Sequence, residues 1–447
     1  MHIIRKFLWI MNLMNNKTYI QYLFKDDDFF YVTTDVKRAL GLEDILPNFH
    51  VITSVYDPLI PLLRNKNIHV FCLEEEVEKE NMSVKSARQL FFHPKAQNYI
   101  HNQSSRPNIL TFKPVEGMGE EKGEDGYEYI GNGRELNEQF EDKINFYQIL
   151  KDNFKENMVP SIIGQLAELT YGNIRDQLGE SLVIQFGKGW AGNTSFDVEN
   201  ESDFENLKKR FPQTHVRVSK RINGNTFLNN CCIYKNTIFH SSPAIQINGI
   251  SWLNKNPLAT SGREWGNKFL SSKETEEIRF LTEKMGRLLI KSTYRGYFGL
   301  DFIVDSVTGK VYVSEINARF TASCPFYTKL ELGSEILPLY VYHLAEFLGK
   351  DIKKEYRRYE GIEGCEVNGE LDKMSNLRVG TYKIEDDGTF DFENDSYDPA
   401  KILKDEVVLI TDPKNSVKIQ TNYPLLASPG KFQEKFEKII KKEIITG

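Results

Sequence analysis

The stretch GLDFIVDSVTGKVYVSEINARF, residues 299–320, decides how this sequence is interpreted. Two runs rich in β-branched and aromatic residues flank the turn-forming segment SVTG, a pattern typical of a β-hairpin. A three-residue loop over 307–309 would place Gly309 at the left-handed position that such a loop favours. Counting back along both strands from that loop puts Asp301 directly opposite Glu315. The sequence therefore predicts two neighbouring carboxylates on adjacent strands.

These paired carboxylates indicate a site for a divalent cation. Directly paired Cβ atoms lie about 4.5–5.5 Å apart, close enough for two carboxylates to share an ion. Side chains alternate along a strand, so Asn317 and Arg319 should point to the same face as Glu315. Carboxylate and amide oxygens are ligands that Mg²⁺ takes together with water and phosphates. The alternative is a solvent-facing hairpin that carries charges, but the opposite face is apolar, with Leu300, Phe302 and Ile316.

A glycine-rich loop supplies a second candidate site. The segment SLVIQFGKGWAGNTSFDV predicts a strand that ends at Phe186, a loop over 187–194, and another strand. Glycine lets the backbone approach a ligand closely, while Lys188 and Thr194 would add a cation and a hydroxyl near phosphates. Because this loop joins two strands, it is neither a Walker A loop nor a dinucleotide-binding fingerprint, both of which open a helix. A merely flexible turn is the alternative.

Composition narrows the class of protein. The 447 residues are 40% hydrophobic and 27% charged, with a formal net charge of -6, so we expect a globular chain without a nucleic-acid partner. No apolar stretch reaches the roughly 20 residues that a membrane-spanning helix needs, so we expect no membrane partner. Five cysteines are an odd count without a C-x-x-C pair, which favours a reducing, cytoplasmic location.

The order of predicted elements indicates three units of α/β and α+β class. Strands and helices alternate over residues 1–138, with the opening HIIRKFLWIMNLM expected as a buried first strand and a Gly- and Glu-rich exposed linker at 117–133. Residues 139–348 mix helices and strands, and SKRINGNTF is expected as an ordinary hairpin that turns at Asn223 and Gly224. Residues 349–447 begin with a charged segment and are expected to form an accessory module.

Taken in order, these pieces resemble the ATP-grasp superfamily, which includes D-alanine:D-alanine ligase, glutathione synthetase and biotin carboxylase. The resemblance rests on Asp142-Lys143 before a helix, the LVIQ strand with its glycine loop, the SKRING segment, and GLDF followed by VSEINARF. It implies a pre-ATP-grasp α/β domain, an ATP-grasp domain of two α+β subdomains, and the C-terminal accessory module. It also implies ATP as cofactor with two Mg²⁺ ions, for which Mn²⁺ could substitute.

The resemblance assigns roles to individual residues. Asp301, Glu315 and Asn317 match the metal ligands, and Arg319 matches an arginine that stabilises the transferred phosphate. The predicted nucleotide-binding residues are Lys143, Gln185, Gly187, Lys188, Gly189, Gly192, Asn193, Thr194, Ser219, Lys220, Arg221 and Ile222, the last four forming the adenine hinge. Arg263, in the GREWGN segment, is a candidate carboxylate clamp because arginine offers bidentate geometry, with a solvated loop arginine as the alternative.

Two departures from the pattern bear on the substrate. Gln185 stands where a strand lysine often contacts phosphate, and Gly299 stands where the D-alanine ligase branch has an arginine. The Gln185 strand, SSPAIQ and GREWGN instead resemble the peptide-ligase group that includes the pheganomycin-type enzyme. The resemblance thus implies a carboxylate-amine ligase acting on small carboxylates and amines, such as amino acids or peptides, with a homodimer left open. The alternatives are a carboxylase-like or phosphotransferase enzyme, or a nucleotide-binding regulatory protein without turnover.

Overall fold

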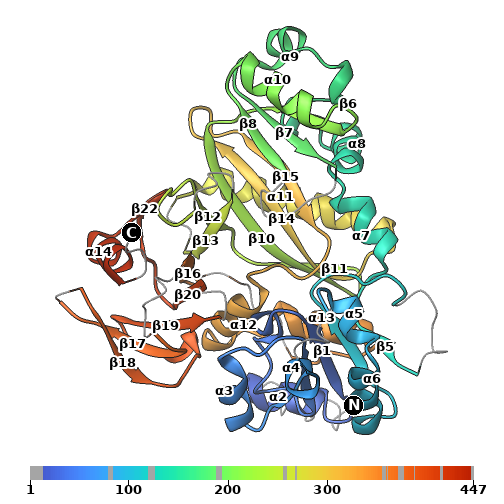
Figure 1. Ribbon diagram of the computed structural model, residues 1–447, viewed down its shortest axis with the longest axis vertical. Coiled ribbons are helices and arrows are strands. Elements are labelled where there is room, and N and C mark those ends of the chain that lie inside the picture. The colour runs from blue at the N-terminus through green and yellow to red at the C-terminus, as the bar shows by residue number, and fades with distance from the viewer. Residues whose placement is uncertain are drawn as a thin grey trace, which may run out of the picture.

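The computed structural model describes residues 14–78, 84–118, 126–187, 194–254, 259–266, 269–354, 359, 361–370, 377–386, 388–412 and 416–443. Within these ranges the strands form sheets of five, four, eleven and two strands. Figure 1 shows the five-stranded sheet in blue at the bottom and the four-stranded sheet in green at the top. The eleven-stranded sheet runs between them and continues into the orange and red C-terminal strands.

The N-terminal unit is a parallel sheet in the order β3-β2-β1-β4-β5. Its strands are β1 (Phe29–Thr33), β2 (Phe49–Thr53), β3 (His69–Cys72), β4 (Asn108–Thr111) and β5 (Glu128–Tyr129), and its helices are α2 (Asn16–Leu23), α3 (Leu59–Asn65), α4 (Leu73–Glu76), α5 (Ala87–Phe91) and α6 (Pro94–Gln103). Every residue of β1 and β2 is buried, as in a parallel sheet covered on both faces. The strand order reverses between β1 and β4, and ligands of such sheets bind beside the carboxyl ends at this reversal.

The four-stranded sheet is antiparallel, in the order β6-β9-β7-β8, and has its own small core. It contains β6 (Ser161–Gln165), β7 (Leu182–Phe186), β8 (Ser195–Val198) and β9 (His215–Lys220), with α9 (Tyr171–Leu178) and α10 (Glu201–Arg210). Two helices, α7 (Arg134–Glu141) and α8 (Lys143–Asn153), lead into it from the N-terminal unit.

The eleven-stranded sheet has the order β15-β14-β10-β12-β13-β16-β20-β19-β17-β18, with β11 paired to β10. Its strands are β10 (Gly224–Tyr234), β11 (Thr237–His240), β12 (Ala244–Asn248), β13 (Thr260–Trp265), β14 (Gly296–Asp305), β15 (Val311–Asn317), β16 (Gly364–Glu370), β17 (Gly380–Ile384), β18 (Phe390–Asn394), β19 (Glu406–Thr411) and β20 (Ser416–Thr421). A separate two-stranded sheet pairs β21 (Leu426–Ser428) with β22 (Lys431–Phe432). The strands after residue 348 therefore continue the same large sheet, and the division into three units at 138 and 348 stays a prediction.

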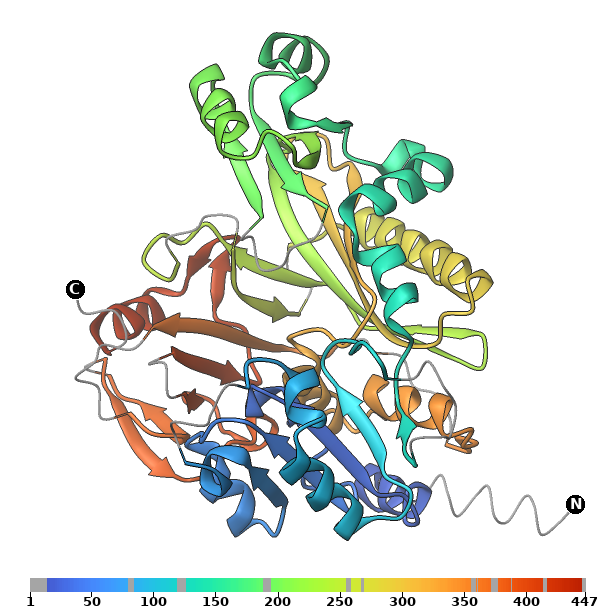
Figure 2. The ribbon, with the colours of Figure 1, turned by 45° about the vertical axis from the view of Figure 1, so that its right-hand side comes forward.

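One face of the large sheet packs on a long helix, and part of the opposite face packs on two further helices through Trp265 and Tyr234. The helix α11 (Ser272–Lys291) begins at a capping box, in which Ser271 and Glu274 each accept from the other's backbone N–H, and buries Ile278 and Met285 against the sheet. The remaining helices are α12 (Cys324–Gly333), α13 (Leu339–Phe347) and α14 (Glu434–Glu443). In both ribbon views the N-terminal unit lies beside the C-terminal strands (Figure 2), where Lys37 contacts Asp412.

Several local expectations need correction. The segment SKRINGNTF is no hairpin, because β9 and β10 belong to different sheets and residues 221–223 connect them. Gly224 is required at the start of β10, since a Cβ there would lie 2.2 Å from the carbonyl oxygen of Val304. The linker expected over 117–133 includes β5, and the expected first strand lies outside the described residues apart from its boundary.

Candidate active site

The predicted hairpin is present as β14 and β15, and Asp301 lies directly opposite Glu315. Its loop is one residue longer than predicted, because the Asp305 N–H donates to the Lys310 carbonyl at 3.0 Å and residues 306–309 form the turn. A bulge next to Asp301 then shifts the register back by one residue. The pairing of the two carboxylates is confirmed, but the three-residue loop from which it was counted is wrong.

The two carboxylates differ in their partners. Gln246 Nε2 donates to Asp301 Oδ1 at 3.0 Å, and Asn317 Nδ2 donates to Asp301 Oδ2 at 3.3 Å. Burial, and then the negative charge of Glu315, raises the pKa of Asp301 to about 7. Burial also disfavours the charge of Glu315, but the Lys143 ammonium, 3.0 Å away, outweighs it and lowers the pKa of Glu315. Burial and the neighbouring Glu315 disfavour the negative charge of Asp301, so a cation bound between the two carboxylates would stabilise it.

The available oxygen ligands fit a magnesium ion that is coordinated partly by the protein and partly by the phosphates of a nucleotide. Asn317 uses its amide nitrogen on Asp301, which leaves the amide oxygen available. Among the described residues, no three His, Cys, Asp or Glu side chains converge on one point. Two carboxylates and an amide oxygen are too few for an all-protein cage but match the ligands that Mg²⁺ takes when phosphates and water complete its octahedron.

Lys143 reaches this pair from the first residue of α8. Asp142 caps the helix by accepting from the N–H groups of Ile144 and Asn145 at 2.9 and 3.1 Å. The Lys143 N–H donates to the Gly187 carbonyl at 2.9 Å, which joins the start of α8 to the end of β7. The lysine is only 7% exposed, so its ammonium is held beside the carboxylates rather than in solvent.

The glycine loop is described only at its two ends. Lys188, Gly189, Gly192 and Asn193 lie outside the described residues. At the ends, the Phe186 N–H donates to the Thr194 carbonyl at 3.0 Å, and Gln185 Nε2 donates to Ser195 Oγ at 3.3 Å. The loop thus joins β7 to β8, as the sequence predicts, and Gln185 faces the same cavity as Asp301.

The predicted adenine hinge runs from the end of β9 to the large sheet. Ser219 is buried and accepts a hydrogen bond from Ser161 Oγ at 3.0 Å. Lys220 is exposed, and Arg221 pairs with Asp197 at 2.6 Å. All four hinge residues, Ser219 to Ile222, line the cavity that contains Asp301.

Arg319 is held from two sides. Its Nε lies 2.9 Å from Glu141 Oε1, at ion-pair distance although not aligned as a hydrogen bond, and its guanidinium lies 5.0 Å from the ring centre of Phe112. Arg38 contacts the same ring at 4.2 Å. Phe112 directly follows β4, so the N-terminal unit helps to fix the arginine of the hairpin.

Arg263 lies on a strand, not in a solvated loop. Its side chain, 12% exposed, projects from β13, where Arg263 pairs with Gln246 on β12 and with Glu366 on β16. A single polar row therefore crosses the sheet from Gln246 through Arg263 and Glu366 to Gln420 on β20. The row begins at Gln246, whose amide contacts Asp301.

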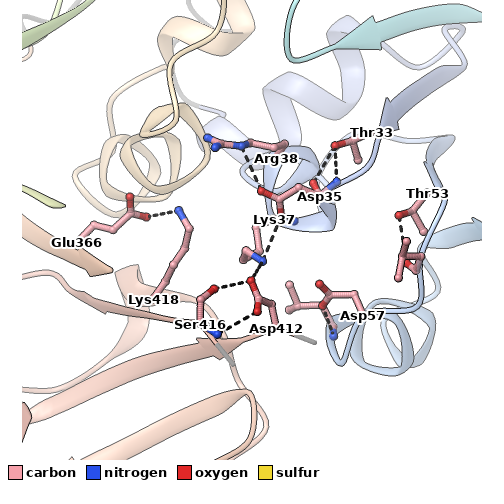
Figure 3. Close-up of polar contacts among 12 residues, drawn as sticks. Thr33, Asp35, Lys37, Arg38, Thr53, Asp57, Glu366, Asp412, Ser416 and Lys418 are labelled. Atoms are coloured by element: carbon pink, nitrogen blue, oxygen red, sulfur yellow. Dashed lines mark hydrogen bonds and ion pairs between the residues drawn. The ribbon is translucent and has the colours of Figure 1, made fainter. Parts of the chain in front are cut away.

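One cavity of about 1430 Å³ unites these groups. Its lining includes the metal-site candidates Asp301, Glu315 and Asn317, together with both predicted arginines. Charged side chains that follow β1, β2 and β19, together with Glu366 on β16 and Lys418 on β20, close its other end (Figure 3).

Solved structures of known enzymes share this architecture. The Aspergillus clavatus N5-carboxyaminoimidazole synthase, in complex with ADP and 5-aminoimidazole ribonucleotide, has a TM-score of 0.56 at 10% identity over 90% of this chain and 95% of that one. The biotin carboxylase of Campylobacter jejuni in its β,γ-ATP complex has a TM-score of 0.58 at 14% identity, covering 89% and 88%. The biotin carboxylase domain of Hydrogenobacter thermophilus 2-oxoglutarate carboxylase, with MgADP and bicarbonate, has a TM-score of 0.58 at 12% identity, covering 89% and 86%.

This chain has the ATP-grasp fold. The predicted fold class is thereby confirmed. No protein-family model matches the chain, and neither does any curated protein. None of the described helices is long and apolar enough to cross a membrane.

The sequence patterns do not identify the residues that contact the predicted site residues from distant parts of the chain. Glu141 and Phe112 contact Arg319, while Glu366 and Lys418 belong to strands assigned to an accessory module. A signal existed for Glu366, because GCEVNGE alternates polar residues with Cys365 and Val367, which point to the core.

Proposed function

We propose that this protein is an ATP-dependent carboxylate-amine ligase that works through an acyl phosphate and releases ADP and phosphate. The observation that supports this most strongly is the direct opposition of Asp301 and Glu315, with Asn317 beside them, in a cavity large enough for a nucleotide and a second substrate. The solved structures of the same fold were obtained with ADP, MgADP or β,γ-ATP, which supports ATP and Mg²⁺ as ligands here.

In this proposal the hairpin and Lys143 handle the phosphates. Asp301, Glu315 and Asn317 would hold two Mg²⁺ ions, or Mn²⁺ as a substitute, which would supply positive charge against the phosphoryl oxygens. Lys143 exchanges its contact with Glu315 for a phosphate oxygen. The ends of the glycine loop, Gln185 and the hinge Ser219–Ile222 surround the rest of the nucleotide, and Lys188, Gly189, Gly192 and Asn193 stay predicted contacts.

The two arginines act at the reacting groups. Mg²⁺-bound ATP supplies the phosphoryl group, which a substrate carboxylate accepts as ADP leaves. An amine then displaces phosphate from the acyl phosphate, so that one C–N bond forms, one C–O bond breaks, and the ammonium gives up two protons, one to phosphate and one to solvent. Arg319 stabilises the transferred phosphate, and Arg263 orients the carboxylate.

For the substrates we propose amino acids or peptides. The resemblance of the Gln185 strand and of GREWGN to the pheganomycin-type peptide ligases supports this class. A homodimer and a cytoplasmic location complete the proposal; one of the solved structures of this fold is a domain dimer, and all five cysteines are free and buried.

A carboxylase-like enzyme is the second candidate. It is favoured by two of the solved structures, which contain bicarbonate and 5-aminoimidazole ribonucleotide respectively. Such an enzyme would release ADP only when bicarbonate is present and would form no amide between two organic substrates.

The test is a screen for substrate-dependent ADP and phosphate release over pairs of amino acids and small carboxylates, with mass detection of products and with bicarbonate removed or added. In Asp301→Ala and in Glu315→Ala we expect ADP release to vanish, because each variant removes a cation ligand worth about 3–4 kcal/mol of transition-state stabilisation. The matched control is Asp391→Asn, an exposed carboxylate on β18 of the same sheet, which should keep full activity. Undiminished product-linked ADP release in either alanine variant would contradict the proposal.

A further inference from the structure

The part of the cavity beyond the metal hairpin has a charge pattern of its own. Its wall interleaves acids and bases, among them Asp35, Asp57, Glu366, Asp412, Lys37, Arg38, Arg263 and Lys418. Lys37 lies 3.2 Å from Asp35 and 3.0 Å from Asp412, and Arg38 lies 3.3 Å from Asp35 (Figure 3). Lys37, Arg38 and Lys418 are each paired with an acid of this wall, so these three cations are already neutralised.

Two neighbours in the polar row have unused hydrogen-bonding atoms. Arg263 Nε and Glu366 Oε1 are buried and have no hydrogen-bond partner among the described residues. The Glu366 side chain is 1% exposed, and its other oxygen accepts from Lys418 Nζ at 3.2 Å and from Gln420 Nε2 at 2.8 Å. Buried polar groups are normally satisfied, so one free donor beside one free acceptor suggests a ligand that offers both.

The spacing of the two charged groups suits one small ligand. Arg263 Nη1 lies 4.0 Å from Glu366 Oε1, so the two charges attract without touching. A carboxylate and an ammonium on one carbon atom could meet both at once. Burial works against the charge of Glu366, but Lys418 and then Arg263 outweigh it and lower its pKa, so the carboxylate is available to a cation.

The order of residues along the row gives the ligand a direction. Starting from the metal-site carboxylate Asp301, the row meets Gln246, then Arg263, then Glu366. A zwitterion with its carboxylate on Arg263 and its ammonium on Glu366 therefore points its carboxylate toward the phosphoryl-transfer end. That orientation is the one required of the substrate whose carboxylate is phosphorylated.

We propose that Arg263 and Glu366 bind the head group of a free α-amino acid as the acyl donor, with Glu366 selecting for its unblocked ammonium. This inference rests on the proposed function and adds the class of the activated substrate. Peptides remain acceptable as the amine that attacks second, but an N-blocked or amine-free acid is rejected as donor, because Glu366 Oε1 would then stay buried without a hydrogen-bond donor.

Hydroxylamine provides a test that does not depend on the natural amine. With MgATP and hydroxylamine, an acyl phosphate is trapped as a hydroxamate, and ADP is measured in parallel. The twenty amino acids are compared with their amine-free and N-acetyl counterparts, for example alanine with propionate and with N-acetylalanine. We expect hydroxamate from one or a few free amino acids, with kcat/KM at least about 30-fold above that of their counterparts. Counterparts that react within about threefold of the amino acid overturn the inference while leaving the ligase proposal intact.

The variant Glu366→Gln sharpens this result. It should raise the KM for the amino acid by roughly 30-fold, so that the preference over the amine-free acid disappears. Glu393→Gln, which changes an exposed carboxylate on β18, is the matched control and should retain the preference. Retention of the preference in Glu366→Gln overturns the assignment of this residue.

If Glu366→Gln does not fold, as judged by thermal unfolding with and without MgADP, the comparison of substrates on the unaltered protein decides. If no carboxylate yields ADP or hydroxamate, the proposed function fails and this inference falls with it.

Discussion

The strand pairs β14–β15 and β16–β20 belong to one sheet and line one cavity. They differ in the partners that they give to a buried carboxylate. The first pair places Asp301 directly against Glu315, two like charges that repel across the strands. The second places Glu366 against Gln420, with Lys418 also contacting Glu366. The first arrangement suits a cation brought from outside, whereas in the second Lys418 already lies beside the carboxylate. Removing the charge of a buried carboxylate, or of its partner, should therefore change the stability in opposite directions at the two ends of the cavity.

The largest effect that follows from this comparison is on stability. Lys418→Met should lower the free energy of unfolding by about 3 kcal/mol, because it leaves the Glu366 carboxylate buried without its cation. Asp301→Asn should instead raise it by up to about 1 kcal/mol in the absence of nucleotide and Mg²⁺, because it removes a like-charge pair. Urea unfolding of both variants measures the two signs. Equal destabilisation by the two substitutions would show that the contrast between the strand pairs has no energetic basis.

A smaller effect concerns the positioning of Arg319. Glu141 ends α7 and contacts both Arg319, at 2.9 Å, and Lys113, at 3.7 Å. In Glu141→Gln we expect kcat to fall about tenfold with little change in the KM for ATP, because the guanidinium loses its fixed direction but not its charge. Glu141→Asp should recover part of the loss.

The matched control is Glu135→Gln, an exposed change on the same helix. A rise in KM for ATP with unchanged kcat would indicate that Glu141 supports nucleotide binding rather than the placement of Arg319.

One part of the site can be predicted from the local sequence, and the other depends on pairing between strands that are far apart in the sequence. Asp301, Glu315 and Asn317 lie within one hairpin, so local alternation is enough to bring them together. Even there, the opposition of Asp301 and Glu315 was obtained from a loop one residue too short, and the bulge beside Asp301 compensates for that error. A bulge has no signal in a single sequence, since it depends on the fit of the strand to its neighbours.

The partners of Arg263 could not be predicted in the same way. Glu366 is about a hundred residues away along the chain and becomes a neighbour only because β16 pairs with β13. Hydrophobic alternation indicates which face Glu366 occupies, but not which strand lies beside it. For the same reason the local pattern around Asn223 and Gly224 predicts a hairpin, whereas residues 221–223 join two sheets. The turn residues do not specify which sheet each flanking strand enters, because that depends on distant strands.

A further contrast comes from a carboxylate that belongs to neither strand pair. Glu331, on α12, is 1% exposed and accepts from the Leu339 N–H at 3.1 Å, and it has no cationic partner among the described residues. Burial raises its pKa well above the usual value, so the folded protein keeps this carboxyl protonated where the unfolded chain would ionise it. Glu331 therefore contributes its full stabilisation below about pH 4.3, the pKa of a glutamate in the unfolded chain. This stabilisation is lost as the pH rises toward the higher pKa that Glu331 has in the folded protein.

Glu331→Gln removes this dependence, because a glutamine keeps the acceptor for Leu339 and never ionises. We expect both forms to be equally stable near pH 4, and the variant to become more stable above it, with a gap that widens by at most about 1.4 kcal/mol per pH unit. Activity per folded molecule should not change, since Glu331 does not line the cavity. Unfolding measured from pH 4 to pH 8 tests the gap, with the exposed Glu335→Gln as the control that should show none. A constant gap at every pH would mean that Glu331 is ionised in the folded state, and that this buried carboxylate, like Glu366, has a cation beside it.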